Sequence, residues 1–226
     1  MKHSRNKKKK INKNNFDKLS VFPPKKYNFK KKCPLSEKDA PVIDYKNVKL
    51  LLDATYPEII INCSAFSDVD GCEIDRNKAH QINVQGIQNL ISNSKKDVTI
   101  VQISSDYIYD GSKGLYNEND PTFPINYYGK TKLESENILI GSHKKYLIIR
   151  PNVIFSEYID KKSNFFGWIY NSLINERKIN VVNDQVSNPT YIDDLVDIIF
   201  KSILLNKNGI YNYGGDSVIS RYEFAK

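Results

Sequence analysis

Three short runs of β-favouring apolar residues, separated by helical segments, constrain the fold of this chain more than any other feature. The runs are Ile59–Ile61, Val98–Ile103 and Tyr146–Arg150. Continuous apolar runs of this length are typical of strands that are buried on both faces of a parallel sheet. Residues 76–92 and 125–140, which lie between the runs, carry apolar side chains at helical spacing. The alternation predicts an α/β fold with a doubly wound parallel sheet.

The flanking regions extend this pattern less regularly. Before the first strand, Asp44 is the expected N-cap of a short helix. Beyond Pro151 we expect, in order, a helix at 165–175, a strand at 179–182, a helix at 192–205, a strand at 210–213 and a helix that begins near Ser220. The predicted organisation is a basic tail at 1–40, a Rossmann-like domain at 41–155 and a small C-terminal lobe at 156–226.

Positive charge is concentrated at one end of the chain. The net charge is +8, and residues 1–32 hold 13 Lys or Arg with a single acidic residue, so the remainder is net negative. We interpret the tail as a solvated, disordered extension rather than a nucleic-acid-binding surface. No run approaches the ~18 apolar residues of a membrane span, and no apolar segment follows Lys7–Lys10. A cytoplasmic protein without membrane contact or metal site is expected.

The end of the second strand and the helix that follows it carry the expected chemistry. Ser104-Ser105-Asp106 closes the strand, and the helix places Tyr128 and Lys132 on one face. The spacing Tyr-x-x-x-Lys occurs six times in this chain, so the strand that ends in hydroxyl groups selects this pair. A nearby ammonium lowers the pKa of a tyrosine, and Ser105 would hold a substrate oxygen in line with the Tyr128 proton. This arrangement predicts general acid catalysis of the kind that oxidoreductases use.

Seven segments, which include these residues, follow one another in unbroken order. They lie in a region that runs from about Asp44 to the C-terminus. They are PEIIINCSAFSDVDGCE, INVQGIQNL, QISSDYIYDG, YNENDPTFPINYYGKTKLESE, RPNVIF, VVNDQVSNPTYIDDL and GIYNYGGDSVISRYEFA. Together they resemble the dTDP-4-dehydrorhamnose reductase family of extended short-chain dehydrogenases. The resemblance implies hydride transfer from NADPH or NADH to the 4-keto carbon of a nucleotide-linked deoxyhexulose, in dTDP-rhamnose biosynthesis.

The same resemblance assigns roles to individual residues. It implies that Tyr128 is the catalytic acid, that Lys132 binds the nicotinamide ribose and tunes Tyr128, and that Ser105 takes the family's Ser/Thr position. The implied cofactor-binding residues are Asn62, Ser64, Ala65, Ser104, Tyr128 and Lys132. The implied substrate-side residues are Asp106, Tyr107, Asp184 and Gln185. Strand-end and turn chemistry would explain Asn62 and Asp184-Gln185 as well, and we interpret Arg150 as structural. The sequence is also compatible with a homodimer.

One departure from the family's pattern concerns the cofactor. A dinucleotide-binding fold has a Gly-rich turn after its first strand, because only Gly lets the backbone approach the pyrophosphate. The first glycine in this sequence is Gly71, which follows the strand that ends near Asn62. We therefore expect an incomplete N-terminal β-α-β unit, a C-terminal helix that is cut short, and weak or absent NAD(P)H binding. The strand Ile59–Ile61 is expected to have an open edge.

Two functions are thus predicted. The leading one is an NAD(P)H-dependent reductase with Ser105, Tyr128 and Lys132 as its catalytic set, whose activity in this chain the missing glycine turn would impair. The alternative is a non-catalytic regulatory subunit that resembles the methionine adenosyltransferase beta subunit, which shares the ISSDY and YGKTKL segments. The intact catalytic set favours the enzyme, whereas the missing glycine turn favours the regulatory subunit.

Overall fold

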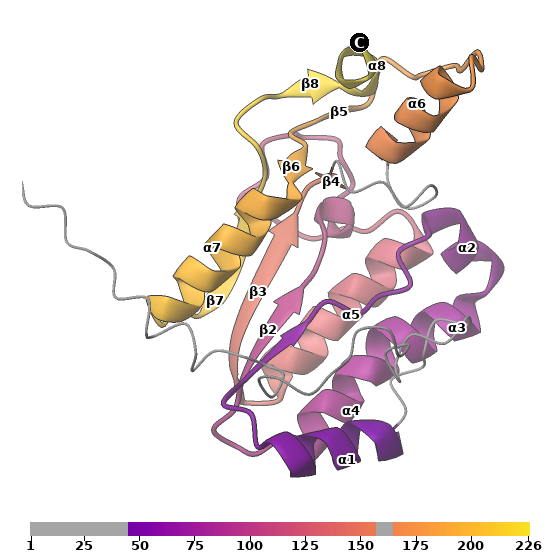
Figure 1. Ribbon diagram of the computed structural model, residues 1–226. Helices are drawn as coiled ribbons and strands as arrows, with labels where there is room; N and C mark the ends of the chain where they lie inside the picture. Colours follow the sequence, from indigo (N-terminus) through magenta and orange to yellow (C-terminus); the bar gives the residue numbers. More distant parts are fainter. Residues whose placement is uncertain (1–44, 157–164) are drawn as a thin grey trace, which may run out of the picture.

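A four-stranded parallel sheet forms the centre of the structure, a computed structural model that describes residues 45–156 and 165–226 (Figure 1). Its strand order is β1-β2-β3-β7. The strands are β1 (Ile59–Asn62), β2 (Thr99–Ile103), β3 (Lys145–Pro151) and β7 (Gly209–Tyr213). All three pairings are parallel, with Ile60 opposite Ile100 and Gln102 opposite Ile148. The predicted parallel α/β sheet is confirmed.

Helices cover both faces of this sheet (Figure 1). On one face lie α1 (Tyr45–Thr55), α3 (Arg76–His80), α4 (Gly86–Asn93) and α5 (Tyr127–Gly141). A π-helical stretch, Gln81–Gln85, joins α3 to α4, so the helix predicted at 76–92 is one continuous helical segment. On the other face lies α7 (Ile192–Leu204). Long helices on both faces bury both sides of the central strands, as their continuous apolar runs require.

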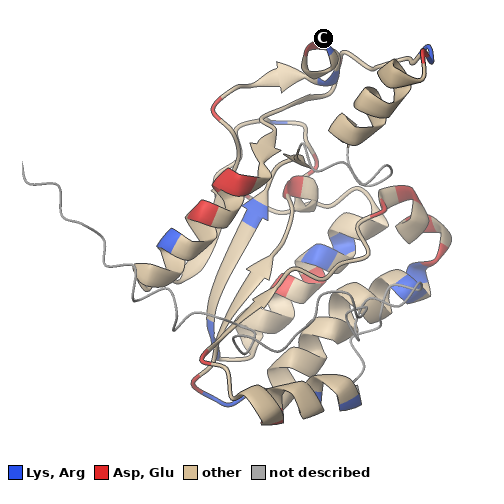
Figure 2. Cartoon of the chain, in the orientation of Figure 1, with Lys and Arg blue, Asp and Glu red and all other residues tan. Residues whose placement is uncertain are grey.

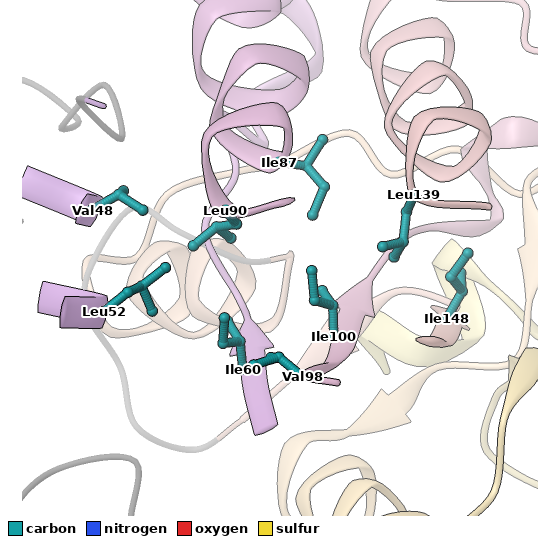
Figure 3. Packing of buried hydrophobic residues seen from close by; sticks show 9 residues of the cluster. All are labelled: Val48, Leu52, Ile60, Ile87, Leu90, Val98, Ile100, Leu139 and Ile148. Atoms are coloured by element: carbon teal, nitrogen blue, oxygen red, sulfur yellow. The ribbon is translucent and has the colours of Figure 1, made fainter. Parts of the chain in front are cut away.

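The core on the first face joins helices to alternate strand residues. Val48 of α1 packs with Leu90 of α4, and Leu139 of α5 packs with Ile100 and Ile148 of the sheet (Figure 3). The opposite face has its own cluster, in which α7 covers the strand residues that point the other way; its buried members are Val101, Leu147, Ile149, Leu195 and Ile199. This period-2 division of the strands between two cores fixes their register.

Small elements gather beyond the carboxyl ends of the strands (Figure 1). They comprise α2 (Val69–Ile74), α6 (Phe165–Ile174), α8 (Arg221–Ala225), β4 (Ile154–Phe155), β5 (Val186–Ser187), β6 (Thr190–Tyr191) and β8 (Ile219–Ser220). β4 pairs with β6 in parallel, and β5 pairs with β8 in an antiparallel arrangement. Phe155 contacts the rings of Phe166, Tyr191 and Phe224, so aromatic packing holds these short elements together.

Two sequence expectations differ from the structure. The strand predicted at 179–182 is wrong: the segment is irregular, and the short strands β5 and β6 lie further along. β-Propensity without a neighbouring strand does not make a strand. The boundary predicted after residue 155 does not follow the layers either, because α7 and β7 fall within 156–226 yet cover and extend the main sheet.

The distribution of charge and the open edge of the sheet are two further features of the described residues. Acidic and basic residues are interspersed over the described part of the chain (Figure 2), whereas the predicted tail at 1–40 and the Asp44 cap lie outside it. Within residues 45–156 and 165–226, β1 pairs only with β2, so its other edge has no strand beside it. No helix in these two ranges has the length and apolar character needed to cross a membrane. Cys63 and Cys72 are free thiols.

Candidate active site

The N-terminal end of α5 is held directly against the end of β2. Asn126 caps the helix, its Oδ1 accepting from the Gly129 N–H at 2.7 Å. A Cβ at Gly129 would collide with the carbonyl oxygen of Tyr107, so glycine allows this close approach. Ser105 in turn caps the 3-10 turn Asp106–Ile108, its Oγ accepting from the Tyr107 N–H at 3.2 Å. Two local caps and one glycine therefore bring α5 to the strand end that carries Ser105.

Tyr128 and Ser105 are brought together as predicted. Their side chains share a hydrogen bond, and the Tyr128 ring packs edge-on against Tyr107 with 5.7 Å between centroids. Only 8% of Tyr128 is exposed. Burial raises the pKa of Tyr128 to about 12, although the Ser105 hydrogen bond favours the phenolate. The Tyr128 hydroxyl is therefore protonated at neutral pH and lies next to the Ser105 hydroxyl, which suits a general acid.

Lys132 lies on the buried face of α5 together with Tyr128, as predicted. It is 2% exposed, and its Nζ donates to the carbonyl oxygen of Ile103 at 2.6 Å. Burial lowers the pKa of Lys132 to about 8, while the nearby Glu136 charge acts in the opposite direction. The expected lowering of the Tyr128 pKa is contradicted, because desolvation of the phenol outweighs the charges and hydrogen bonds around it.

Asp106 extends the hydrogen-bonded line from Tyr128. The Ser105 Oγ donates to Asp106 Oδ1 at 3.1 Å. Burial raises the pKa of Asp106 to about 6, against the opposing effects of the Ser105 hydrogen bond and of the Arg221 charge. Tyr128, Ser105 and Asp106 thus form one connected line, from the buried phenol to a carboxyl group that titrates near neutrality.

The residues expected along the cofactor lie at the ends of β1 and β2. Asn62 donates from Nδ2 to Gln102 Oε1 at 2.8 Å, and its Oδ1 accepts from the Ser64 Oγ at 2.6 Å. Asn62 therefore has the strand-end role, and Ala65 is half-buried beyond it. The buried Ser104 Oγ has no hydrogen-bond partner within the described part of the chain. An orphaned hydroxyl near Lys132 fits the nicotinamide end of a dinucleotide.

The pyrophosphate end fits less well. No glycine precedes Gly71, so the sequence before it lacks the Gly-rich turn that lets phosphate oxygens approach backbone N–H groups. The residues present therefore fit the nicotinamide end of the cofactor that the resemblance implies, but not its pyrophosphate end.

A cavity of about 780 Å³ lies at the Asp106 end of the hydrogen-bonded residues Tyr128, Ser105 and Asp106. Asp106, Tyr107, Asp184 and Gln185, the four residues expected on the substrate side, all contribute to its lining. Tyr128 and Lys132 do not, so the cavity ends beside them at Asp106 and Tyr107. Other lining residues are Tyr109, Lys113, Tyr116, Arg150, Asn152, Asn188, Asn212 and Arg221. The volume and the mixture of cations, amides and aromatic rings suit a polar ligand larger than a single sugar.

Several of these lining residues carried no functional signal in the sequence. Tyr109 and Asn212 lie on separate elements and meet through a hydrogen bond of 3.1 Å between the Tyr109 hydroxyl and Asn212 Oδ1. Asn152 Oδ1 is buried without a partner among the described residues, so it can accept from a ligand. Gly129 could have been identified from the sequence, since a glycine directly after Tyr128 at the start of a helix is compatible with a close backbone approach.

The chain is similar in sequence to known proteins. The sequence matches the family described as "RmlD substrate binding domain" over residues 26–226. The chain belongs to this family. A curated relative, the dTDP-4-dehydrorhamnose reductase of Aggregatibacter actinomycetemcomitans, is 33% identical over 77% of the chain. The aligned region makes up 61% of that relative, so the chain spans about three fifths of its length.

A solved structure with a similar sequence agrees with the fold. The dTDP-4-dehydrorhamnose reductase of Bacillus anthracis, solved in complex with NADP, superposes with a TM-score of 0.76 at 32% identity. The superposition covers 81% of this chain and 65% of that one. Methionine adenosyltransferase 2 subunit beta of Xenopus tropicalis is 25% identical over 80% of the chain, which covers 57% of that protein.

Proposed function

We propose that this chain carries the catalytic and substrate-binding part of an NAD(P)H-dependent reductase that acts on a nucleotide-linked 4-keto-6-deoxy sugar, as in dTDP-rhamnose biosynthesis. The observation that carries the proposal is the line Tyr128–Ser105–Asp106, which leads from a buried phenol to the wall of the cavity. The similarity to curated dTDP-4-dehydrorhamnose reductases supports the substrate class.

In this proposal each residue has a defined task. Tyr128 donates its proton to the carbonyl oxygen of the substrate, because its raised pKa keeps the phenol protonated at neutral pH. Ser105 orients that oxygen through its hydroxyl. When bound, the nicotinamide cofactor supplies the hydride for the carbon. We assign the nicotinamide ribose to Lys132 and to the Ser104 hydroxyl, which has no hydrogen-bond partner among the described residues.

The cavity provides for the rest of the substrate. Arg221 and Lys113 are cations in its lining, suited to a diphosphate. Asp184 and Gln185 line it from the loop after α6, where they can accept from or donate to sugar hydroxyls or a base.

The test is NADPH oxidation by the purified chain with dTDP-4-dehydro-L-rhamnose, at millimolar cofactor. We expect Tyr128→Phe to abolish turnover, because only the proton donor is removed and the ring still packs on Tyr107. Tyr127→Phe, the same change one residue earlier on α5, is the control and keeps turnover. Equal turnover in Tyr128→Phe and the wild type would exclude Tyr128 as the acid.

A second function is favoured by one observation, the similarity to methionine adenosyltransferase 2 subunit beta. In that role the fold would bind a catalytic partner and the Tyr128 hydroxyl would be dispensable. Co-purification with a methionine adenosyltransferase catalytic subunit, undiminished by Tyr128→Phe, would support it over the reductase.

A further inference from the structure

We propose that Arg150 is a positioning residue that ties the wall of the cavity to the catalytic helix. The wall in question is the loop of residues 109–118, called here the wall loop, of which residues 109–116 all line the cavity. Arg150 reaches α5 through Glu136 and the wall loop through Tyr109 and Glu118. The identity of the ligand rests on the proposed function, whereas the connection itself does not.

The contact with α5 is a buried ion pair. Arg150 Nη2 donates to Glu136 Oε2 at 2.7 Å, and Nε donates to Oε1 at 3.1 Å. The two residues are 4% and 1% exposed. Glu136 lies one helical turn beyond Lys132, which lies one turn beyond Tyr128, so all three side chains share the buried face of α5. The pair therefore links β3 to the helix face that carries the chemistry.

The contacts with the wall loop are made by Nη1, the guanidinium nitrogen that does not bind Glu136. Arg150 Nη1 donates to the Tyr109 hydroxyl at 2.8 Å and to the Glu118 carbonyl oxygen at 3.3 Å. Tyr109 and Glu118 stand at the two ends of the wall loop. A single side chain thus fixes both ends of the segment that faces the ligand.

The neighbouring strand β7 holds the same loop from the other side. The Asn212 backbone N–H donates to Glu118 Oε1 at 2.8 Å, and its side-chain Nδ2 donates to the Tyr116 carbonyl oxygen at 2.9 Å. The Tyr109 ring stacks on Tyr116 with 4.3 Å between centroids. The loop tip itself is exposed and contains two glycines with positive φ, Gly111 and Gly114. Hydrogen bonds such as that from the Lys113 N–H to the Tyr116 hydroxyl stabilise the tip internally, whereas the anchors at its ends fix the loop relative to the sheet.

The chemistry of the pair argues for positioning rather than for stability. A buried ion pair is a weak source of stability, because the loss of hydration of both ions offsets their attraction. What a guanidinium group adds is direction, since its planar fork donates to Glu136 and to the wall loop at once. A lysine at this position could satisfy Glu136 but not all three partners. Arg150 is thus suited to setting the distance between the cavity wall and Tyr128.

Hydrogen–deuterium exchange of the purified chain tests this without any assumption about ligand or activity. Tyr109→Phe removes the hydroxyl that accepts from Arg150 Nη1 and that also donates toward the Asn117 carbonyl oxygen and Asn212 Oδ1, and it leaves the stacking on Tyr116. A further variant, Arg150→Lys, separates the Arg150 contact from the other two. We expect exchange in residues 110–117 to become at least about tenfold faster, because the hydrogen bond to the charged guanidinium group is lost together with those that the hydroxyl donates, while β3 is unchanged. Tyr146→Phe, the same change at the other end of β3, is the control and leaves the wall loop unchanged.

Two outcomes would overturn the proposal. One is unchanged exchange in the wall loop of Tyr109→Phe. The other is uniformly faster exchange over the whole chain, which would mean that the hydroxyl serves global stability only. Arg150→Lys is the second variant: we expect it to keep the charge beside Glu136, to keep β3 protected and to release residues 110–117.

Binding of dTDP, measured by calorimetry, links the loop to the ligand. We expect about tenfold weaker binding to Tyr109→Phe and unchanged binding to Tyr146→Phe, because a loop that opens must be ordered again on binding. Absence of dTDP binding in both the wild type and Tyr146→Phe would count against the proposed function and leave the exchange result standing. Faster loop exchange with unchanged dTDP affinity would instead refute the positioning role.

Discussion

At the scale of the residue, Lys132 combines a buried position with a charge. Burial lowers its pKa from 10.5 to about 8, so between these values the unfolded chain binds more protons than the folded one. The free energy of unfolding of the wild type therefore rises as the pH increases through this window. Lys132→Met cannot titrate. We expect the wild type to gain about 2–3 kcal/mol relative to this variant between pH 7 and 10.5.

Urea unfolding at the two pH values measures this difference. Lys130→Met, an exposed lysine of the same helix, is the control for the loss of one cation. Parallel pH profiles for the wild type and Lys132→Met would contradict the prediction. Lys132→Met is also expected to lose reductase activity, so at neutral pH the residue serves the reaction at a cost in stability.

Asp106 shows the opposite dependence on pH. Burial raises its pKa from 3.8 to about 6, so the folded state binds more protons in this window and stability falls as the pH rises. We expect Asp106→Asn to be more stable than the wild type by about 2 kcal/mol at pH 7.5, and equal to it near pH 3.5. Asp110, where hydrogen bonds from Tyr116 and Ser112 lower the pKa, is the matched control. Asp110→Asn should instead lose stability at pH 7.5, and chemical denaturation at both pH values checks both signs.

At the scale of the element, the entry of α5 depends on Gly129. A Cβ there would collide with the Tyr107 carbonyl oxygen and press on Pro124. Alanine is the better helix former, yet we expect Gly129→Ala to lose at least about 2 kcal/mol of stability and most activity, since α5 must move away from Ser105. Gly141, at the other end of α5, has open space around it. Gly141→Ala should be neutral or stabilising by about 0.5–1 kcal/mol, and thermal unfolding of both variants tests the contrast.

The elements also show what can be predicted from sequence and why. The runs at Ile59–Ile61 and Val98–Ile103 became strands of the main sheet because continuous apolar sequence needs burial on both faces, whereas Ile179–Val182 had the propensity but no neighbouring strand. Ser105 and Tyr128 could be predicted because a strand end and a helix face fix them locally. Arg150 could not, because its role depends on Tyr109 and Glu136, which only the tertiary fold brings within hydrogen-bonding distance.

At the scale of the whole molecule, the cavity and the residues proposed to bind the cofactor lie on different elements. The cavity is lined by the wall loop, by the ends of β3 and β7 and by the small elements beyond the sheet, including Arg221. The residues proposed to bind the cofactor lie at the ends of β1 and β2 and on α5, and no glycine precedes Gly71 in the sequence. A phosphate group deprived of a backbone cradle loses several hydrogen bonds, each worth about 1.5–3 kcal/mol. Binding of the two ligands should therefore be separable in this chain.

We expect a protein of these 226 residues to bind dTDP more tightly than NADPH. At a dTDP concentration of 100 times its dissociation constant, the folded state gains about 2.7 kcal/mol, which thermal unfolding detects, whereas NADPH at the same concentration should have little effect. Arg221→Met should weaken dTDP binding because it removes a cation from the cavity, while Arg177→Met, an exposed arginine after α6, should not. Sub-millimolar NADPH binding by calorimetry would show that backbone other than a Gly-rich turn holds the pyrophosphate.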